Sequence, residues 1–328
     1  MMHASKMVKY TVAIKHFSGR CLELLFVNIA LLIVPRLSRK AVINLSKILG
    51  GIAMIFGRRI FRVALVNLDI VYGDTKTARE KRTIAKASYR HFGLVMLEYF
   101  WLMKDTTSRL QSLVNSTDPV IERWITGTFP GLFVTAHIGN WEVGGQYIAL
   151  RGRVMTSIYR PIGTAKTMNA LTSFREATGQ NLISREGAMP FILRAIRNNS
   201  LIAMVLDQHT EIDDGGIYID FFGLPATISG AAGIFANRLK VPICIAAAIR
   251  NPETDTYSVY VERELNPEDT DGLTMEKITQ MIVDSIESMI KKHPEQWLWS
   301  YRRWKRYRSI DDKSLFPFYA KLDTLYKE

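Results

Sequence analysis

Apolar runs that alternate with amphipathic segments along residues 131–291 limit the fold of this chain more than any other feature of its sequence. Such runs predict strands, and apolar residues at helical spacing predict helices. The predicted strands lie at 131–137, 154–160, 181–184, 201–207, 241–249 and 256–264, and the predicted helices at 78–104, 141–150, 165–177, 188–198, 229–239 and 273–291. This alternation is typical of α/β proteins. We therefore predict a mixed sheet flanked by helices, whose last strands can be antiparallel.

Residues 61–328 contain no internal repeat and no linker rich in proline, glycine or serine, so we predict that they form one α/β domain. Two apolar stretches precede it, CLELLFVNIALLIV at 21–34 and VINLSKILGGIAMIF at 42–56. The first is shorter than the about 20 apolar residues that a transmembrane helix needs. Its basic flanks favour a segment that lies in one face of a membrane. We predict residues 1–60 to be membrane-associated helices, with ordinary core helices as the alternative.

The formal net charge of +12 indicates an acidic partner, such as nucleic acid, an anionic membrane surface, or an acidic carrier or substrate. Charge alone does not distinguish among these partners. The two cysteines, Cys21 and Cys244, are too few for a disulfide framework or for a zinc site built from cysteines. This cysteine content favours a reducing compartment.

Polar residues follow three of the predicted strands. His137 ends GLFVTAH, Tyr159 and Arg160 end VMTSIYR, and Asp207 ends LIAMVLD. Ligands of α/β sheets bind beyond the carboxyl ends of the strands. The sequence therefore predicts a site at this edge of the sheet.

The stretch TAHIGNWEVGG at 135–145 places Glu142 five residues after His137. We predict that His137 lies on a turn and that Glu142 lies in the first turn of the next helix, with its carboxylate folded back to the imidazole. A carboxylate in this place would fix the tautomer of the histidine and raise its basicity, as a general base near neutral pH requires. Alternatively, Glu142 only stabilises the N-terminus of the helix through the macrodipole.

A metallohydrolase is an interpretation from a different class, since His137, Glu142, Asp207 and His209 could be recruited as ligands. The sequence contains no HExxH motif and no second cluster among its six histidines, so we expect no metal. It also lacks the G-x-S-x-G elbow of serine hydrolases and the Walker A motif of nucleotide enzymes.

HIGNWE matches the H-x4-D/E signature of glycerolipid-type acyltransferases, and its surroundings resemble the bacterial lipid A secondary acyltransferases. The resemblance extends along most of the chain. Its blocks are RVALVNLDIVY at 62–72, TAHIGNWEVGG, YRP at 159–161, Arg175, Arg185, DQH at 207–209, FFGLPATISGAAG at 221–233 and PEQWLWSYRRWK at 294–305. The bare signature is weak, but these blocks in this order are specific.

The resemblance implies an O-acyltransferase at the cytoplasmic face of the inner membrane. Its donor would be an acyl thioester, carried by acyl carrier protein or as acyl-CoA, and its acceptor a hydroxyl of an anionic lipid A precursor. His137 would deprotonate this hydroxyl for direct attack on the thioester, with Glu142 orienting it, and no cofactor is implied. Phosphatidylinositol mannoside acyltransferases share the core blocks, so acylation of such a glycolipid by acyl-CoA is the alternative.

The same resemblance implies supporting roles for several further residues. These are Arg160, Arg175, Arg185, Asp207, Phe221, Phe222 and Gly223. The arginines suit an anionic phosphate or a developing oxyanion, and Asp207 would orient Arg175 or another basic group. The phenylalanines and Gly223 of FFGLPA would line an acyl or acceptor groove. Surface ion pairs, a turn carboxylate and ordinary core packing are the respective alternatives.

The segment KKHPEQWLWSYRRWKRYR at 291–308 interleaves basic and aromatic residues. Such a pattern can stack on nucleic acid, or it can lie at a membrane interface where it meets lipid phosphates or an acidic carrier protein. The apolar N-terminus favours the membrane interface. We therefore predict a membrane surface as a partner and no nucleic acid.

Overall fold

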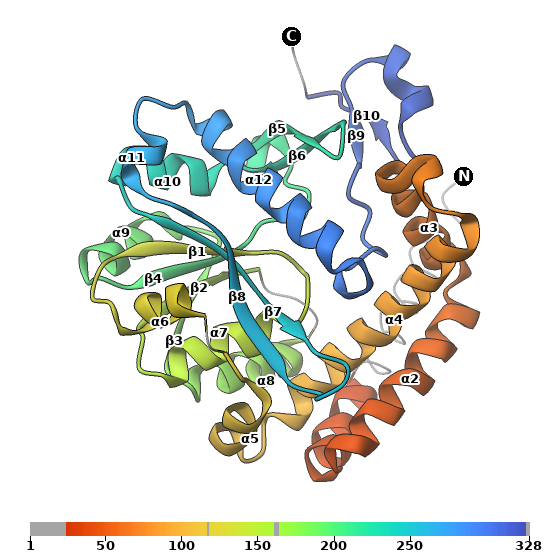
Figure 1. The fold of residues 1–328 in the computed structure, drawn as a ribbon, viewed down its shortest axis with the longest axis vertical. Helices are drawn as coiled ribbons and strands as arrows, with labels where there is room; N and C mark the ends of the chain where they lie inside the picture. Colours follow the sequence, from red (N-terminus) through yellow and green to blue (C-terminus); the bar gives the residue numbers. More distant parts are fainter. Residues whose placement is uncertain (1–23, 117, 161–163, 326–328) are drawn as a thin grey trace, which may run out of the picture.

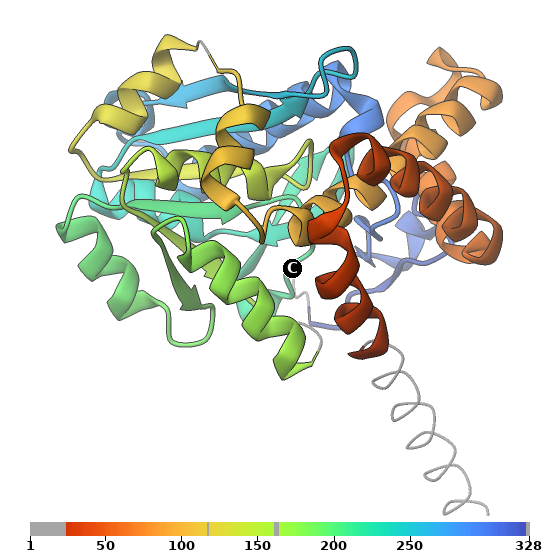
Figure 2. The same cartoon turned by 90° about the horizontal axis from the view of Figure 1, so that it is seen from below.

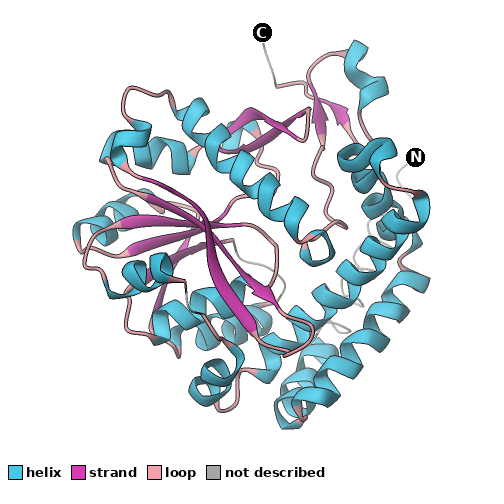
Figure 3. Cartoon of the chain, in the orientation of Figure 1, coloured by secondary structure: helices cyan, strands magenta, loops and turns pink. Residues whose placement is uncertain are grey.

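The computed structural model describes residues 24–116, 118–160 and 164–325, apart from the side chains at 170 and 171. Its centre is a six-stranded sheet in the order β3-β2-β4-β1-β7-β8 (Figure 1; by element type in Figure 3). The strands are β1 (Gly131–Thr135), β2 (Met155–Tyr159), β3 (Gln180–Ser184), β4 (Leu201–Val205), β7 (Ile243–Arg250) and β8 (Tyr257–Leu265). Among the described residues, neighbouring strands of this sheet are parallel except for β7 and β8, which are antiparallel. The predicted mixed sheet flanked by helices is confirmed.

Helices cover both faces of this sheet, because successive side chains of a strand point to opposite faces. In β1, Phe133 packs in the apolar cluster that includes α7 (Trp141–Leu150) and α8 (Ala165–Glu176). The next residue, Val134, packs in the cluster that includes α9 (Met189–Arg197), α10 (Ala231–Leu239) and α12 (Met275–Lys292). The sheet is therefore buried on both faces. Helices leave uncovered the end at which its parallel strands finish, and this end is where a ligand can bind.

Several smaller elements surround this core and were not predicted from the sequence. They are α5 (Thr106–Leu113), α6 (Pro119–Thr126), α11 (Pro267–Thr270), the hairpin β5 (Gly216–Phe221) and β6 (Leu224–Ser229), the short pair β9 (Arg306–Tyr307) and β10 (Lys321–Leu322), and the 3-10 turns at 34–36, 73–75, 212–214, 294–296 and 310–315. The hairpin lies between the end of β4 and α10 along the chain. It thus borders the site that the strand ends form.

The N-terminal region consists of helical residues 24–33, α2 (Arg39–Phe56), α3 (Arg58–Tyr72) and α4 (Ala78–Trp101). Thr77 begins α4 with a capping box, in which Glu80 accepts a hydrogen bond from the Thr77 backbone. Figure 2 shows these helices at one side of the sheet, where α2 packs along α4. The domain boundary predicted at residue 60 lies inside α3, and the division into two units stays a prediction.

In the part of the chain that the structure describes, no helix has the length and apolarity needed to cross a membrane. Of the first predicted apolar stretch, residues 21–23 lie outside the described residues. Residues 24–33 and α2 do expose large apolar side chains, namely Leu25, Phe26, Ile29, Leu32, Ile33, Ile48, Ile52, Ile55 and Phe56. Membrane association of this region stays a prediction.

The aromatic segment at 291–308 lies mostly in the core. Trp297, Trp299 and Trp304 are at most 2% exposed, and Arg303 is fully buried with its guanidinium over Phe221. Because these rings pack against one another and against Phe221, they cannot anchor the protein in a membrane interface or stack on nucleic acid. The prediction of an interfacial role for these tryptophans is wrong.

Candidate active site

The register of the sheet brings His137 and Asp207 together. Thr135 of β1 and Val205 of β4 form the last parallel pair between these strands. His137 and Asp207 each follow two residues later, so they leave the same edge of the sheet side by side. This convergence at the strand ends was predicted from the sequence.

The imidazole of His137 is held by the carboxylate of Asp207. Nδ1 of His137 lies 2.6 Å from Oδ1 of Asp207, and the backbone nitrogen of His137 donates to Oδ2 at 3.0 Å. A carboxylate can only accept, so the proton of the neutral imidazole lies on Nδ1. This tautomer leaves an unprotonated lone pair on Nε2, which can take a proton as in a catalytic base.

Trp297 completes the environment of the Asp207 carboxylate. Its indole Nε1 donates to Oδ2 at 2.8 Å, and Asp207 is only 3% exposed. Burial alone would raise the pKa of Asp207, but its interactions with His137 and Trp297 hold this pKa below its ordinary value. Asp207 is therefore ionised near neutral pH and can stabilise a positive charge on His137. The sequence block around Trp297 carried the resemblance without indicating this contact.

Nε2 of His137 faces a cavity and has few neighbours. The side-chain nitrogen of Gln208 lies 3.3 Å from it, and the ring of Trp141 stands edge-on to the imidazole with 4.7 Å between the ring centroids. The imidazole side chain keeps 20% of its surface exposed. This atom can therefore be reached by a substrate hydroxyl.

Glu142 does not contact His137, contrary to the sequence-based prediction. Its carboxylate accepts two hydrogen bonds from Arg175 of α8, at 3.0 Å from Nε to Oε2 and 2.5 Å from Nη2 to Oε1, and one from Trp141 at 3.2 Å. Burial lowers the pKa of Arg175, but Glu142 raises it more, so the guanidinium stays charged. The two carboxylates thus serve different partners, Asp207 the imidazole and Glu142 the arginine.

The turn between His137 and α7 is fixed from α4. Asn140 caps α7 by accepting hydrogen bonds from the backbone of Glu142 and Val143, and it donates to the buried carboxylate of Glu98 at 2.6 Å. Burial lowers the pKa of His91, and its Nε2 donates to the backbone oxygen of Gly139 at 2.9 Å. Helix α4 therefore positions the turn that carries the imidazole.

Gly139 is required at this turn, and we expect Gly139→Ala to destabilise the fold by roughly 2–5 kcal/mol. Its φ of +57° is strained for an L-residue, and a Cβ would lie 1.9 Å from the oxygen of Ala248. Gly152→Ala is the matched control, since its φ is +88° but no heavy atom lies within 4 Å of the added Cβ. Denaturant unfolding should show only about 1–2 kcal/mol for the control. Equal losses would show that the contact with Ala248 does not matter.

A cavity of about 760 Å³ opens beside His137. Its polar lining includes Gln208, Glu142, Arg175, Arg160 and Arg185. Its apolar lining comes from both sides of the sheet edge, namely Phe133, Met155, Ala203, Ala246, Ala248 and Val259 on the α7 side, and Ile158, Ile192, Met204, Phe235 and Ala247 on the α9 and α10 side. A cavity with an apolar lining and a few polar groups suits an amphiphilic ligand.

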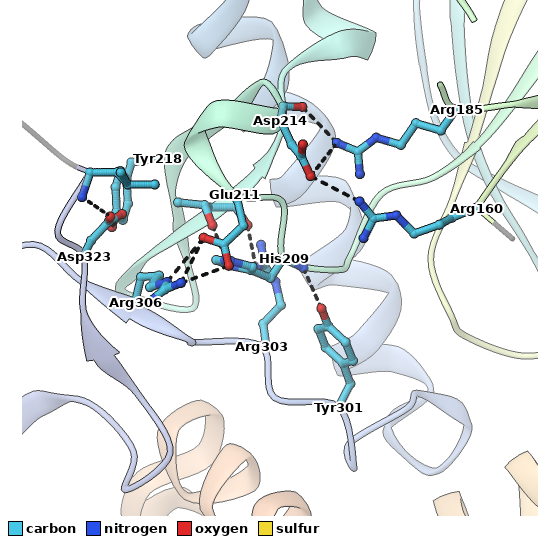
Figure 4. A network of polar contacts seen from close by, with 12 residues as sticks. Arg160, Arg185, His209, Glu211, Asp214, Tyr218, Tyr301, Arg303, Arg306 and Asp323 are labelled. Carbon is cyan, nitrogen blue, oxygen red and sulfur yellow. Dashed lines mark hydrogen bonds and ion pairs between the residues drawn. The ribbon is translucent and has the colours of Figure 1, made fainter. Parts of the chain in front are cut away.

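Arg160 and Arg185 lie together at the border of this cavity. Figure 4 shows both guanidiniums directed at Asp214, with Nη2–Oδ2 distances of 3.1 Å for Arg160 and 3.7 Å for Arg185. Arg175, by contrast, is occupied by Glu142 and stands apart from this pair. The three predicted arginines therefore line one cavity but have two separate partners.

Phe221, Phe222 and Gly223 do not line the cavity, contrary to the groove predicted for FFGLPA. Phe221 ends β5 and is fully buried against Trp297 and Trp304, whereas Phe222 and Gly223 form the turn of the β5–β6 hairpin. The alternative of core packing is correct for Phe221. Pro161, from the predicted YRP block, lies outside the described residues.

Among residues 24–116, 118–160 and 164–325, no group of three or more histidine, cysteine, aspartate or glutamate side chains could hold a metal ion. His209, which the metallohydrolase interpretation would use, instead contacts Thr227 at 2.6 Å and Glu211 at 3.0 Å. His209 lines the same cavity as His137, but these contacts hold its imidazole to β6 and to Glu211.

Comparison with known proteins agrees with the block pattern of the sequence. The family described as bacterial lipid A biosynthesis acyltransferase matches residues 15–306. A lipid A biosynthesis palmitoleoyltransferase of Escherichia coli (strain K12) and a lipid A biosynthesis acyltransferase of Shigella flexneri are each 22% identical to this chain over 271 residues. Each alignment covers 82% of this chain and 86% of the relative.

Proposed function

Because the chain belongs to the family of bacterial lipid A biosynthesis acyltransferases, we propose that it transfers a fatty acyl chain from an acyl thioester to a hydroxyl of a lipid A precursor. The family makes it an O-acyltransferase with a lipid A-type acceptor and an acyl donor. The observation that supports the chemistry is the 2.6 Å contact between His137 Nδ1 and Asp207, which leaves Nε2 unprotonated at the cavity.

In the proposed reaction, Nε2 of His137 accepts the proton of the acceptor hydroxyl while the hydroxyl oxygen attacks the thioester carbonyl carbon. A tetrahedral intermediate forms, with negative charge on the former carbonyl oxygen. The amide of Gln208, 3.3 Å from Nε2, is a donor within reach of this oxygen. The carbon–sulfur bond then breaks, and the imidazolium returns the proton to the leaving thiolate. No acyl-enzyme forms, and the thioester is the co-substrate rather than a bound cofactor.

Asp207 lowers the energy of the imidazolium that forms in the first step. Its carboxylate is buried and ionised, so its interaction with the developing charge is stronger than it would be in water. Glu142 and Arg175 support the base without contacting it, because their hydrogen bonds fix the first turn of α7 to α8 beside the cavity. This pairing also stabilises a charged guanidinium near the substrate.

The cavity suits the acyl chain of the donor. Its apolar walls include small side chains, Ala203, Ala246 and Ala248, that leave room beside the sheet. Burial of a methylene group contributes about 0.8 kcal/mol, so a fatty acyl chain gains most of its binding energy there. We propose acyl carrier protein as the donor's carrier, since an acidic carrier complements a net charge of +12.

The exposed apolar face of residues 24–33 and α2 supports association with the cytoplasmic face of the inner membrane. Exposed basic residues, among them Arg58 and Arg59, adjoin this face at the end of α2. Apolar side chains beside cations are typical of segments that lie in an anionic membrane interface. Because α2 packs along α4 and α4 holds the catalytic turn, this placement keeps the site close to lipid substrates.

We expect Ile55→Ser with Phe56→Ser to weaken binding to anionic vesicles at least about tenfold, since burial of each side chain contributes about 1.5–3 kcal/mol. These side chains are 64% and 85% exposed at the end of α2. Phe191→Ser on α9 is the control, because Phe191 is 55% exposed and α9 lies across the molecule from α2 (Figure 1). Vesicle co-sedimentation measures both. Equal loss in the two proteins would contradict the proposed membrane face.

The proposed activity is tested by incubating the purified protein in detergent with acyl thioesters of acyl carrier protein and with acyl-CoA of several lengths. A tetra-acylated lipid A precursor and a phosphatidylinositol mannoside serve as acceptors, and mass spectrometry identifies the products. Acyl addition to the lipid A precursor is the expected result. Addition to the mannoside alone, or to neither acceptor, would contradict the proposal.

A further inference from the structure

Two arginines leave neighbouring parallel strands at the same level. Tyr159 of β2 and Ser184 of β3 form the last pair between these strands, and the backbone nitrogen of Arg185 still donates to Tyr159 at 2.9 Å. Arg160 and Arg185 are the next residues, on strands about 4.8 Å apart. Their guanidiniums therefore extend from one edge of the sheet into the border of the cavity.

These guanidiniums share a single carboxylate. Arg160 contacts Oδ2 of Asp214 at 3.1 Å, and Arg185 contacts the same oxygen at 3.7 Å and donates to the backbone oxygen of Asp214 at 2.8 Å. The side chains of Arg160 and Asp214 are 68% and 48% exposed. Two cations thus face one anion, and exposed pairs of this kind contribute little to stability. Stability alone does not account for the arrangement.

Asp214 is carried on a loop whose other end is fixed. Glu211 forms a paired contact with Arg306, at 3.1 Å to Nη2 and 3.3 Å to Nε, and His209 lies 3.0 Å from Glu211 (Figure 4). Asp214 ends the 3-10 turn that follows, and Gly215 reverses the chain with a φ of +81°. The start of the loop is therefore fixed by the contacts of Glu211, and its end places the carboxylate of Asp214 beside the two arginines.

We propose that Arg160 and Arg185 form a clamp for a phosphate ester of the substrate, and that Asp214 occupies its anion position until the phosphate binds. A phosphate offers more acceptor oxygens than a carboxylate and matches the fork of donors on each guanidinium. The proposal rests on the proposed acyl transfer and adds the group that is recognised. In the strand order β3-β2-β4-β1, Arg160 follows a strand two spacings (about 10 Å) from the strand that carries His137, and Arg185 follows one three spacings (about 14 Å) from it. The clamp binds the substrate away from the reacting atoms.

The test compares Arg160→Gln, Arg185→Gln and Asp214→Asn in the full-length protein. Each arginine variant should raise KM for the phosphate-bearing substrate about tenfold, with the larger part of the change in KM rather than in kcat. Asp214→Asn should lower this KM several-fold, because it removes the competing anion. Arg194→Gln is the matched control, an exposed arginine on α9 that does not line the cavity. It should leave KM unchanged.

The phosphate ester is present in two substrates, so the assay has two arms. One arm compares a phosphorylated lipid A precursor with the same precursor after dephosphorylation. The other compares a donor whose pantetheine arm carries its phosphate with an acyl-pantetheine that lacks it. The effect of the arginine variants should disappear in one arm only, and that arm identifies the phosphate that the clamp binds.

Phosphorus-31 line broadening of inorganic phosphate tests the clamp without acyl transfer. The wild-type protein should broaden the line, Asp214→Asn should broaden it more, and the double variant of Arg160 and Arg185 should not. Absence of transfer by the wild type with this pattern intact would refute the proposed function but retain the clamp. Two results would overturn the clamp and show that Asp214 only fixes the loop. One is a KM that the arginine variants leave unchanged in both arms, and the other is weaker phosphate binding by Asp214→Asn.

Discussion

Replacement of His137 with alanine is expected to lower the rate of acyl transfer by about 10²–10⁴-fold, the range that a positioned general base contributes. The substitution removes the Nε2 atom that would accept the hydroxyl proton and leaves the cavity walls in place. The acceptor must then lose its proton to water, without a positioned base. KM for the acyl donor should change less than kcat, because the apolar lining proposed to bind the chain is retained.

The measurement is initial velocity with a saturating acyl thioester and a lipid A precursor, for proteins with matched unfolding curves. His293→Ala is the control for loss of a histidine, since His293 caps the end of α12 and does not line the cavity. It should retain nearly full activity. A folded His137→Ala protein with wild-type velocity would mean that another group removes the proton.

The strands and helices of the core were predictable because each has a strong apolar period. The predicted helix at 141–150 matches α7 in full, and the helix predicted at 78–104 differs from α4 only at its last three residues. The β5–β6 hairpin has no such signal. Its turn contains Phe222 at a φ of +54° and Gly223 at +79°, and a phenylalanine gives no indication that it adopts a left-handed conformation.

The site was predictable as a place but not as a set of contacts. Strand ends placed His137 and Asp207 at the same edge of the sheet, since ligands bind at the carboxyl edge of such sheets. The sequence does not state that β4 is the neighbour of β1, and this strand order is what sets Asp207 against the imidazole. Glu142 is near His137 in sequence, but the direction of its side chain in α7 sends it to Arg175.

The burial of the aromatic segment at 291–308 could not be predicted from its sequence. Alternating tryptophans and basic residues are found at membrane interfaces, and they are equally compatible with a buried irregular segment. The difference is decided by partners far away in sequence, since Trp304 donates to the backbone of Phe221 and Trp297 donates to Asp207. Neither partner can be identified from the composition of the segment alone.

Replacement of Asp207 with asparagine is expected to lower kcat by about 10²–10⁴-fold, although the side chain keeps its shape. Oδ2 accepts hydrogen bonds from the backbone nitrogen of His137 and from Trp297, so the oxygen of the new amide must take this position. Its NH₂ group then faces Nδ1 of His137. It donates to Nδ1 and places the imidazole proton on Nε2, which can no longer accept a proton from the substrate.

Substitutions of Asp207 and Glu142 are expected to lower kcat to different extents, and the order of the two losses tests which carboxylate assists the base. Glu142→Gln leaves the His137–Asp207 contact in place and weakens only the pairing with Arg175, so its loss of kcat should be at least tenfold smaller than that of Asp207→Asn. If Glu142→Gln were instead the more damaging substitution, Glu142 rather than Asp207 would be the functional partner of the base.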